Sequence, residues 1–403
     1  RMFIEPILDL DLNLLEQHLM ETRSRKDNLL RSAKVEKADL MSNPKFAELL
    51  EGLGVKPPMK ISPTTGKETF AFAKSDDGLK ALQEHENEEV QLLVAARLGN
   101  KSTLEETRTQ RFIDISKRGL LPVPVRYYAA HTGRWGGDDK INLQNLPSRG
   151  RDGKKLKRSI IAPEGCSLID CDSSQIEARV LAWLAEQDDL TQSFNAGEDV
   201  YKKMASRIYV LPEEDVDKDQ RFVGKTTILG AGYGMGAVKF QAQLKTFGFD
   251  MELDEARRVI SIYREANWKI NQLWRDAQNM LTGLTRGDNT QFGLDGVLKV
   301  VDGAILLPSG LKLGYADLQF TQTDKGVEFD YKTRRGRTRI YGGKVIENVC
   351  QAIARCIIGE QMLQIAKKYR VVLTVHDSIV CCVKDDVLEE AQEYIEKCMR
   401  WTP

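Results

Sequence analysis

The segment RFVGKTTILGAGYGMG at residues 221–236 constrains the fold most, because it looks like a phosphate-binding loop but fits neither common type. A Walker-type loop, G-x-x-x-x-G-K-[ST], needs a glycine at position 219 and a strand before it; Asp219 stands there, after an acidic segment. The dinucleotide fingerprint needs a glycine at 235 or 237, where Met235 and Ala237 stand. Both loop interpretations are therefore excluded.

The same segment makes sense as a helix. Arg221, Lys225 and Leu229 follow one another at a spacing of four, which places them on one helical face. Two like charges at this spacing cost a few tenths of a kcal/mol in isolation, roughly 0.2–0.5. An anion bound along this face, such as the phosphates of a nucleotide, would make the two neighbouring positive charges favourable. A solvated basic face is the alternative that the spacing leaves open.

Two short apolar stretches carry acids. In LIDCD (168–172), Asp170 and Asp172 alternate with apolar neighbours and share a strand face. In VVLTVHDSIVCCV (371–383), Asp377 falls at the tip of a predicted hairpin. An acid in a tight turn is most often only a turn former. Two such acids side by side would instead hold two magnesium ions for in-line phosphoryl transfer, although spacing does not establish that the strands meet.

Overall composition and charge leave the partner open. The 403 residues suffice for two or three domains, and 59 basic residues balance 59 acidic ones. Basic clusters occur at RGRDGKKLKR (149–158) and KTRRGRTR (332–339), each of which alone is typical of solvated surface. Together they would suit a track for a phosphate backbone. Seven cysteines without C-x-x-C spacing predict reduced thiols in an intracellular protein rather than a zinc site, and no membrane span or signal peptide is expected.

The periodicity along the chain predicts an α+β layout. Helices are expected over 9–56, 76–119, 174–184, 186–285 and 345–369. Strands are expected at 168–172, in several runs within 291–341, and as the hairpin at 371–383. The Pro-, Gly- and Thr-rich stretch 55–72 is expected to be a loop.

Four motifs, in order, resemble the family A DNA polymerases, the DNA polymerase I-like group, and its bacteriophage members in particular. They are HTGRWGGDDKINLQNLP (131–147), DSSQIEAR (172–179), RFVGKTTILGAGYG (221–234) and VHDS (375–378). The likeness runs from about residue 10 to about residue 400. It implies a right-hand polymerase fold with a thumb at 1–120, a palm with an antiparallel sheet at 121–185 and 291–403, and helical fingers at 186–290.

The resemblance also implies the roles of individual residues. The metal ligands would be Asp172, Asp377 and the backbone carbonyl of Ser173, holding two Mg²⁺ ions, with Mn²⁺ as an alternative. Lys225 would protonate the departing pyrophosphate, which makes it catalytic together with Asp172 and Asp377. The dNTP would contact Arg221, Lys225, Gln175, Glu177, Leu229, Tyr233 and Tyr201, and the primer-template Arg134, Asn142, Gln144, Gln351 and His376.

Within this set, Glu177 resembles a steric gate against a ribose 2′-OH, and Tyr233 would stack near the template base. Arg134 and Gln351 suit the minor-groove acceptors that every base pair offers; a buried helical amide is the plainer alternative for Gln351. Several positions depart from the family pattern: Leu229 replaces an aromatic residue, Tyr201 a histidine, Ser378 a glutamate and Glu347 an asparagine.

The resemblance therefore implies a DNA-directed DNA polymerase in replication or repair, with primer-template DNA and dNTPs as partners and a processivity factor or other replisome proteins as additional ones. We expect a monomer in the cytoplasm, of an infected host if the source is viral, without a proofreading exonuclease and with a C-terminus that the family usually extends. A single-subunit RNA polymerase is one alternative, which Glu177 disfavours. A non-catalytic nucleic-acid-binding relic is the other, disfavoured by the intact Asp172, Asp377, Arg221 and Lys225.

Overall fold

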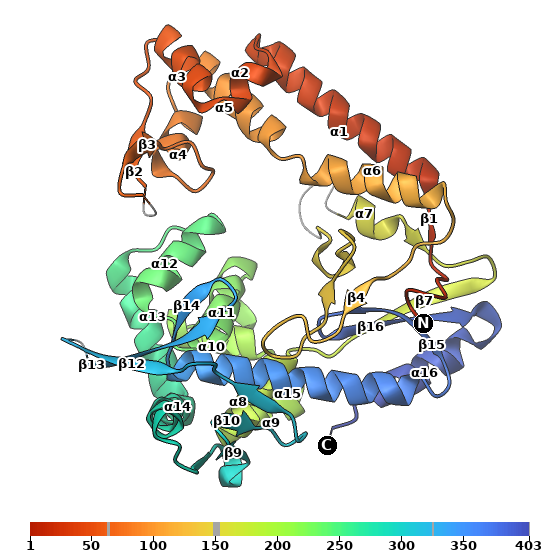
Figure 1. The fold of residues 1–403 in the computed structure, drawn as a ribbon, viewed down its shortest axis with the longest axis vertical. Helices are drawn as coiled ribbons and strands as arrows, with labels where there is room; N and C mark the ends of the chain where they lie inside the picture. The colour runs from red at the N-terminus through yellow and green to blue at the C-terminus, as the bar shows by residue number, and fades with distance from the viewer. Residues whose placement is uncertain (63–64, 148–153, 325, 403) are drawn as a thin grey trace. The chain divides into compact units, whose positions relative to one another are not determined.

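The computed structural model describes residues 1–62, 65–147, 154–324 and 326–402. By contacts, the chain divides into two compact units. The first comprises Arg1–Pro124 with Asp139–Ser167, and the second Val125–Asp138 with Leu168–Pro403 (Figure 1). Each is described by itself below.

The first unit is mainly helical. Its helices are α1 (Leu12–Ala33), α2 (Lys37–Met41), α3 (Asn43–Gly52), α4 (Asp77–Gln83), α5 (Glu88–Lys101), α6 (Leu104–Ser116) and α7 (Lys155–Arg158). Its strands form the antiparallel pairs β1 (Asp9–Leu10) with β6 (Ile160–Ile161) and β2 (Met59–Ile61) with β3 (Glu68–Phe70). Helices α1 and α3 begin at side-chain caps: Asp11 accepts a hydrogen bond from the Leu14 amide, and Ser42 from the Lys45 amide.

The expectation of a loop over 55–72 is wrong in part, because β2 and β3 form a hairpin there. Phe72, just after β3, is buried against Phe46 of α3, with ring centroids 4.8 Å apart. This aromatic contact anchors the end of the hairpin in the hydrophobic core of the unit. The segment therefore forms two short strands joined by a turn, and not a continuous loop.

The second unit combines helices with three small sheets and one short hairpin. The hairpin pairs β4 (Val125–Arg126) with β5 (Gly136–Gly137). One sheet has the order β15-β16-β7, with β15 (Arg370–Val375), β16 (Ser378–Lys384) and β7 (Cys166–Asp172). A second has the order β11-β10-β9-β8, and a third β12-β13-β14. Their strands are β8 (Gln291–Phe292), β9 (Leu298–Val301), β10 (Ala304–Leu306), β11 (Lys312–Gly314), β12 (Gln319–Thr323), β13 (Gly326–Thr333) and β14 (Gly336–Ile340).

The helices of this unit are α8 (Ile176–Leu184), α9 (Asp188–Asn195), α10 (Val200–Tyr209), α11 (Lys218–Ala231), α12 (Ala237–Thr246), α13 (Leu253–Ala266), α14 (Trp268–Arg286), α15 (Gly342–Ile365) and α16 (Leu388–Met399). The long helix α15 packs against α14, α8 and α16 (Figure 1). One core gathers around α8, α14 and α15, and another around α10, α11 and α13. The mixture of helices and antiparallel sheets confirms the α+β prediction.

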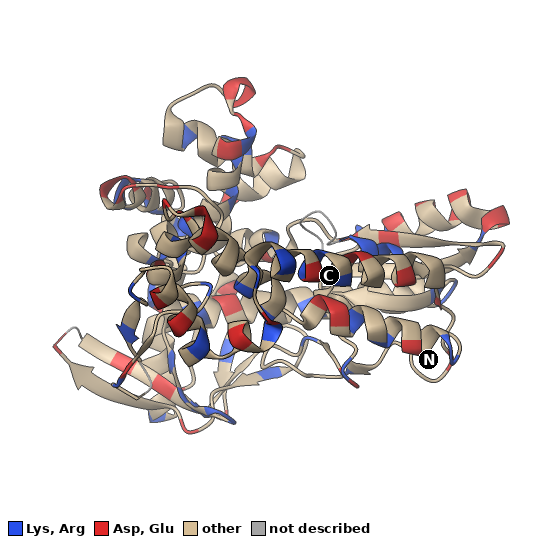
Figure 2. Ribbon diagram, turned by 90° about the horizontal axis from the view of Figure 1, so that it is seen from above, with Lys and Arg blue, Asp and Glu red and all other residues tan. Residues whose placement is uncertain are grey.

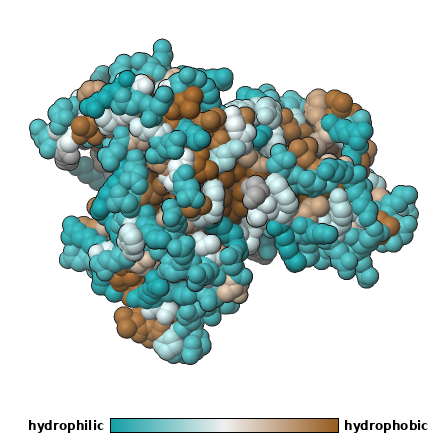
Figure 3. All heavy atoms as spheres, turned by 90° about the horizontal axis from the view of Figure 1, so that it is seen from below, coloured by the Kyte–Doolittle hydropathy of each residue, from teal (hydrophilic) through white to brown (hydrophobic). Residues whose placement is uncertain are grey.

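The surface is predominantly hydrophilic and its charges are mixed. Figure 2 shows basic and acidic residues interspersed along the same helices, in keeping with the equal totals of the two signs. In Figure 3, hydrophobic residues appear among hydrophilic ones on the face shown. None of the helices in the described part of the chain combines the length and hydrophobicity that a membrane crossing requires.

Helix α11 is the segment that imitated a phosphate-binding loop. It begins at a capping box in which Asp217 and Gln220 bond each other's backbone amides, so its start is fixed locally. Gly224, the glycine of the Gly-Lys-Thr triplet, is buried against α10. A Cβ there would collide with the carbonyl oxygen of Tyr201 and lie 3.0 Å from the amide nitrogen of Ala205. This glycine therefore serves close helix packing.

The packing role of Gly224 predicts the effect of adding one methyl group. Gly224→Ala should lower the free energy of unfolding by about 1–3 kcal/mol, because overpacking against rigid backbone outweighs the gain in helix propensity. Gly359→Ala in α15 is the matched control: a Cβ there meets nothing within 4 Å, so stability should stay or rise by up to about 1 kcal/mol. Calorimetric melting of both variants checks this, and equal behaviour of the two would contradict it.

Candidate active site

The predicted acids are brought together at the ends of two neighbouring strands. Asp377 lies in the two-residue turn between β15 and β16, where Val375 pairs with Ser378, so the predicted hairpin tip is confirmed. Strand β16 neighbours β7, which ends at Asp172. The backbone N–H of Ser173 donates to the carbonyl oxygen of Asp377 at 2.9 Å. The two strand ends thus meet directly.

Asp170 occupies a different position from Asp172 on the same strand. Its carboxylate accepts a hydrogen bond from the Ser378 hydroxyl, at the start of β16. Ser378, which stands where the family has a glutamate, therefore ties the two strands together through Asp170. This contact leaves Asp172, at the very end of β7, as the acid beside the Ser173–Asp377 junction.

Arg134 lies between two carboxylates of this site. Its Nη2 contacts Oε1 of Glu177, the first-turn acid of α8, and lies 3.4 Å from Oδ1 of Asp377. Burial raises the pKa of Asp377 above its ordinary value; Arg134 opposes the rise, while Glu177 and Asp172 add to it. The site therefore holds several carboxylates close enough to repel one another, with a guanidinium as their internal cation.

A divalent cation fits this donor set. Among the described residues, no group of three or more His, Cys, Asp or Glu side chains could hold a metal ion. Two carboxylates with a backbone carbonyl are an incomplete ligand set, and magnesium favours such sets because water and substrate phosphates complete its shell. The guanidinium of Arg134 already lies beside the Asp377 carboxylate, where it supplies a positive charge as a metal ion would. Asp172, Asp377 and Ser173 are the residues that would hold the metal.

The cationic face of α11 is assembled around Tyr201. The Arg221 guanidinium and the Lys225 ammonium lie 5.3 and 5.8 Å from the centroid of its ring. Burial raises the pKa of Tyr201, and a hydrogen bond with the Gln175 side chain opposes the rise. Gln175 has a left-handed backbone with φ of +59° at the start of α8. Because Gln175 follows Asp172 by three residues, this contact links the carboxylates to the α11 face.

Asp199 is a site residue that the sequence reasoning missed. Its Oδ2 accepts a hydrogen bond from Nε of Arg221 at 2.6 Å, while Oδ1 caps α10 by accepting from the Tyr201 and Lys202 amides. In this structure the counter-charge of the basic face is thus a carboxylate of the protein. The cap position before α10 was the only local signal; nothing in the spacing links it to Arg221, 22 residues later.

Tyr233, Leu229 and Gln351 lie in the same unit. Tyr233 hydrogen-bonds with the buried thiol of Cys350, and burial raises the pKa of both groups. Leu229 exposes 40% of its surface. Gln351 is half-buried: its Nε2 donates to Glu347 at 3.3 Å, and its Oε1 lies 3.5 Å from the Thr132 hydroxyl. The amide is neither fully buried nor free, and it stands beside the loop that carries Arg134.

The remaining predicted DNA contacts are placed separately. His376 is exposed and has a left-handed backbone with φ of +53° in the β15–β16 turn. Asn142 and Gln144 belong to the first unit, where the Asn142 side chain accepts from the Gln144 amide at 3.2 Å and Gln144 is buried. Asn142 and Gln144 thus belong to a different unit from the other predicted residues.

Several basic residues of the two clusters form ion pairs with acids of the protein. Residues 149–153 of the first lie outside the described part of the chain, and Lys155 pairs with Glu21. In the second, Arg337 bridges Asp317 and Asp330, and Arg339 pairs with Glu328. Nearby acids thus pair with two arginines of the segment 332–339, and a track for a phosphate backbone stays a prediction.

The loop bearing Arg134 is anchored by a residue that the sequence did not single out. Arg355 of α15 donates from Nε to the Gly133 carbonyl at 3.1 Å. Its guanidinium lies 5.2, 5.9 and 4.8 Å from the ring centroids of Tyr127, Tyr128 and Trp135. These cation–π contacts hold both arms of the β4–β5 hairpin on α15. The position of the Arg134 backbone is thus set by the same helix that carries Gln351.

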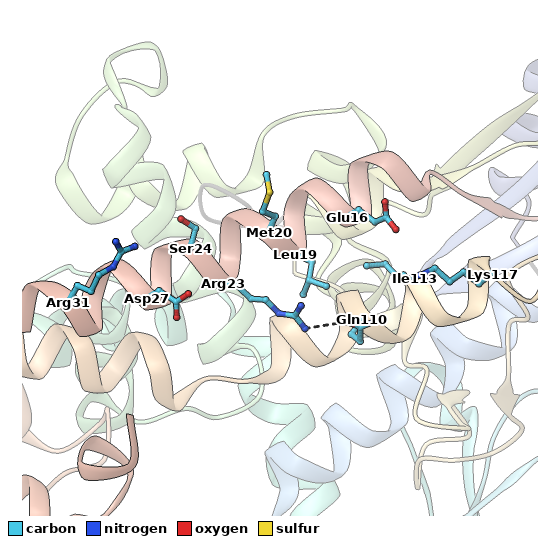
Figure 4. Close-up of a pocket in the computed structure, with 10 residues that line it drawn as sticks. All are labelled: Glu16, Leu19, Met20, Arg23, Ser24, Asp27, Arg31, Gln110, Ile113 and Lys117. Atoms are coloured by element: carbon cyan, nitrogen blue, oxygen red, sulfur yellow. Dashed lines mark hydrogen bonds between the residues drawn. The ribbon is translucent and has the colours of Figure 1, made fainter. Parts of the chain in front are cut away.

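A separate pocket of about 470 Å³ lies in the first unit, between α1 and α6 (Figure 4). Arg23 crosses it and donates to Gln110 at 3.2 Å. Charged side chains of both signs, including Asp27 and Lys117, line the pocket, and it contains none of the predicted site residues. Its mixed charge offers no single chemistry comparable with that of the carboxylate pair.

Comparisons with known proteins point to one family. The model of DNA polymerase family A matches residues 11–288. A DNA polymerase of Bacillus phage SP02 is 27% identical over 355 residues, which cover 75% of this chain and 53% of that protein. DNA polymerase I of Pseudomonas aeruginosa is 33% identical over 219 residues, which cover 54% of this chain and 22% of that protein. The chain thus spans about half, or less, of these relatives' length.

A solved structure has the same fold. The POL domain of Pol1 from M. smegmatis, in complex with DNA primer-template and dNTP, superposes with a TM-score of 0.70 at 20% identity. The match covers 98% of this chain and 64% of that one. The mixed helical and antiparallel-sheet architecture is therefore the one found in polymerase domains of this family.

The Asp199–Arg221 pair predicts a pH-dependent contribution to stability. Burial acts to raise the pKa of Asp199, but the Arg221 hydrogen bond and the Lys202 amide outweigh it, so the pKa lies below its ordinary value of 3.8. A lowered carboxyl pKa stabilises the fold above the unfolded-state value, and the effect is lost as pH falls through the folded-state value. Asp199→Asn keeps the cap but should lower stability at pH 7 by less than about 1 kcal/mol, since the pair is partly exposed.

Calorimetric melting temperatures between pH 7 and the lowest pH at which the protein stays folded would measure this difference. It should shrink below about pH 4. Asp254→Asn, which breaks the exposed Arg257–Asp254 pair, is the control and should show little effect. A difference for Asp199→Asn that is the same at every pH would speak against a charge effect.

Proposed function

The chain belongs to DNA polymerase family A, and we propose that it adds deoxynucleotides to a primer 3′-OH under direction of a template, releasing pyrophosphate. The observation that carries this proposal is the junction of Asp172 and Asp377, closed by the 2.9 Å Ser173–Asp377 backbone hydrogen bond. Through Gln175 and Tyr201 this junction is linked to the cationic face of α11. Carboxylates opposite a cationic face are what phosphoryl transfer from a triphosphate requires.

Asp172, Asp377 and the carbonyl of Ser173 would hold two Mg²⁺ ions, or Mn²⁺ in their place. When bound, such ions activate the attacking oxygen and neutralise charge on the leaving group. The protein's part is to keep these ligands at adjacent strand ends. The backbone hydrogen bond and the Ser378–Asp170 contact both serve that purpose.

The triphosphate would bind along α11. Arg221 and Lys225 would supply two positive charges, and Lys225 would give a proton to the departing pyrophosphate. Gln175 and Tyr201 add hydrogen-bonding groups to the same surface. The phosphates would take over Arg221 from Asp199, and movement of the α11 region would close the site around the nucleotide.

Sugar and base selection would fall to neighbouring residues. Glu177 would exclude a 2′-hydroxyl, Tyr233 would stack near the template base, and Leu229 would pack where relatives have an aromatic ring. The 40% exposure of Leu229 leaves room against the sugar, so sugar selectivity is the property in which this chain would differ from its relatives. Arg134, Gln351, His376, Asn142 and Gln144 would contact primer-template DNA.

On this proposal, residues 1–120 act as thumb, 121–185 and 291–403 as palm, and 186–290 as fingers. The partners are primer-template DNA and dNTPs, with a processivity factor or other replisome proteins as further candidates for a monomeric, cytoplasmic enzyme. The single-subunit RNA polymerase alternative is disfavoured by Glu177, the residue that would exclude a ribose 2′-hydroxyl. Arg134 contacts both Glu177 and Asp377, which places Glu177 near the Asp377 carboxylate. Primer extension on DNA with dNTPs and with NTPs separates the two.

The register of the acids gives a direct test. Asp172→Asn and Asp377→Asn should each reduce primer extension by at least about a thousandfold, because a carboxylate that holds metal contributes several kcal/mol to charge stabilisation. Asp170→Asn, on the same strand face, is the matched control and should lose less than about tenfold. Extension rates with a radiolabelled primer measure all three. Undiminished extension by Asp172→Asn would refute the mechanism.

The gate predicts a change of substrate preference. Glu177→Ala removes the side chain opposite the 2′-position and should lower the preference for dNTPs over NTPs by about tenfold or more, mainly by raising incorporation of NTPs. The ratio of kcat/KM for the two substrates on one primer-template measures this preference. Glu360→Ala, at an exposed position of α15, serves as a control that should leave the ratio near its original value. An unchanged ratio in Glu177→Ala would exclude the gate.

A further inference from the structure

Arg134 is held in place from two sides. In front, its Nη2 contacts Glu177 and lies 3.4 Å from Oδ1 of Asp377. Behind, the Gly133 carbonyl is fixed by Arg355, and Thr132 adjoins Gln351. The backbone of the turn is thus anchored to α15 while the side chain extends toward the carboxylates. The anchoring lets the guanidinium swing between partners without moving the loop.

The carboxylates need a cation at this place. Asp377 is half-buried and faces both Glu177 and Asp172, and their like charges oppose one another. A guanidinium stays charged at every pH that a protein tolerates, so it cannot leave the site by losing a proton. It leaves only by moving. A divalent cation arriving at Asp377 would meet the positive charge of Arg134 at the distance of a direct ion pair, where repulsion is strong.

We propose that Arg134 is the internal counter-ion of Asp377 in the DNA-free enzyme, that it competes with metal ions for this carboxylate, and that a bound primer end draws it away. This inference rests on the proposed function. The turn that carries Arg134 adjoins Gln351 through Thr132, and base pairs offer minor-groove acceptors that suit the Arg134 and Gln351 side chains. A primer end would therefore exchange the carboxylates for base acceptors as partners of Arg134, and would free Asp377 for metal.

The exchange makes metal binding and primer binding mutually dependent. If primer-template strengthens metal binding by some factor, metal must strengthen primer-template binding by the same factor. The enzyme would then bind metal weakly at Asp377 until a primer end is in place. Glu177 loses its Arg134 contact in the same exchange, which frees the gate side chain to meet the incoming sugar.

Mn²⁺ binding, followed by the loss of the free-ion electron paramagnetic resonance signal, tests this without turnover. The samples are full-chain protein alone and protein saturated with a primer-template whose primer ends in a dideoxynucleotide, with binding to DNA alone subtracted. For the wild type, DNA should tighten Mn²⁺ binding by about tenfold, within the usual range of coupling. Arg134→Gln should bind Mn²⁺ tighter by a similar factor without DNA, and DNA should then add little.

Three variants fix the interpretation. Arg134→Lys keeps a positive charge, so it should keep Mn²⁺ binding weak without DNA, and it also shows whether a change at this position is tolerated. Arg337→Gln is the matched control, since Arg337 bridges Asp317 and Asp330 in the same unit; it should leave the affinity unchanged. Asp377→Asn should abolish the DNA-dependent binding and so identifies the site.

The inference is overturned if Arg134→Gln leaves DNA-free Mn²⁺ affinity unchanged, or if DNA still tightens Mn²⁺ binding by the full wild-type factor in that variant. Primer extension by Asp172→Asn would instead overturn the proposed function. The two failures are therefore distinguishable. Failure of the inference is seen in Mn²⁺ affinities measured without turnover, and failure of the proposed function is seen in the rate of nucleotide addition.

Discussion

The hydrogen bond from the Ser173 amide to the Asp377 carbonyl is the contact on which the site depends. It joins the end of β7 to the tip of the β15–β16 hairpin, segments about 200 residues apart in the chain. Neither Asp172 nor Asp377 has chemistry of its own that differs from any surface acid. On the proposed function their proximity would make them metal ligands, and that proximity is a property of strand pairing. Helix α8 then adds Glu177, which shares Arg134 with Asp377, and helix α15 anchors the loop that carries Arg134.

Both charged halves of the site carry their own counter-charges. The carboxylates hold Arg134, and the basic face of α11 holds Asp199. In the DNA-free site these pairs offset part of the local charge of each half. On the proposed function, ligands would bind by exchanging partners with these internal counter-charges. Such exchange makes each ligand sensitive to the presence of the others.

Much of the local structure could be predicted, and the ion pairs could not. The start of α3 at Ser42, helix α11 and the hairpin tip at Asp377 follow from caps, spacing and β-branched runs within a few residues. The Arg134 contacts join residues 43 and 243 positions apart, and the Arg221–Asp199 pair has no local periodicity. The same limit explains the basic segment 332–339, where acids on neighbouring strands neutralise two arginines. The resemblance assigned roles to Asp172 and Asp377, but it did not reveal what occupies them in the absence of ligand.

The close packing at Gly224 has a mechanical consequence. Helices α10 and α11 touch backbone to backbone there, with the Tyr201 carbonyl against the glycine. At Gly224 no side chain separates the two backbones, and this close contact opposes sliding of one helix along the other. The start of α10 and the basic face of α11 are therefore expected to move together. The residues concerned are Asp199, Tyr201, Arg221 and Lys225. A movement of α11 would carry Asp199 along with Arg221 and would not separate the pair. On the proposed function, the phosphates of the nucleotide would have to release Arg221 from Asp199.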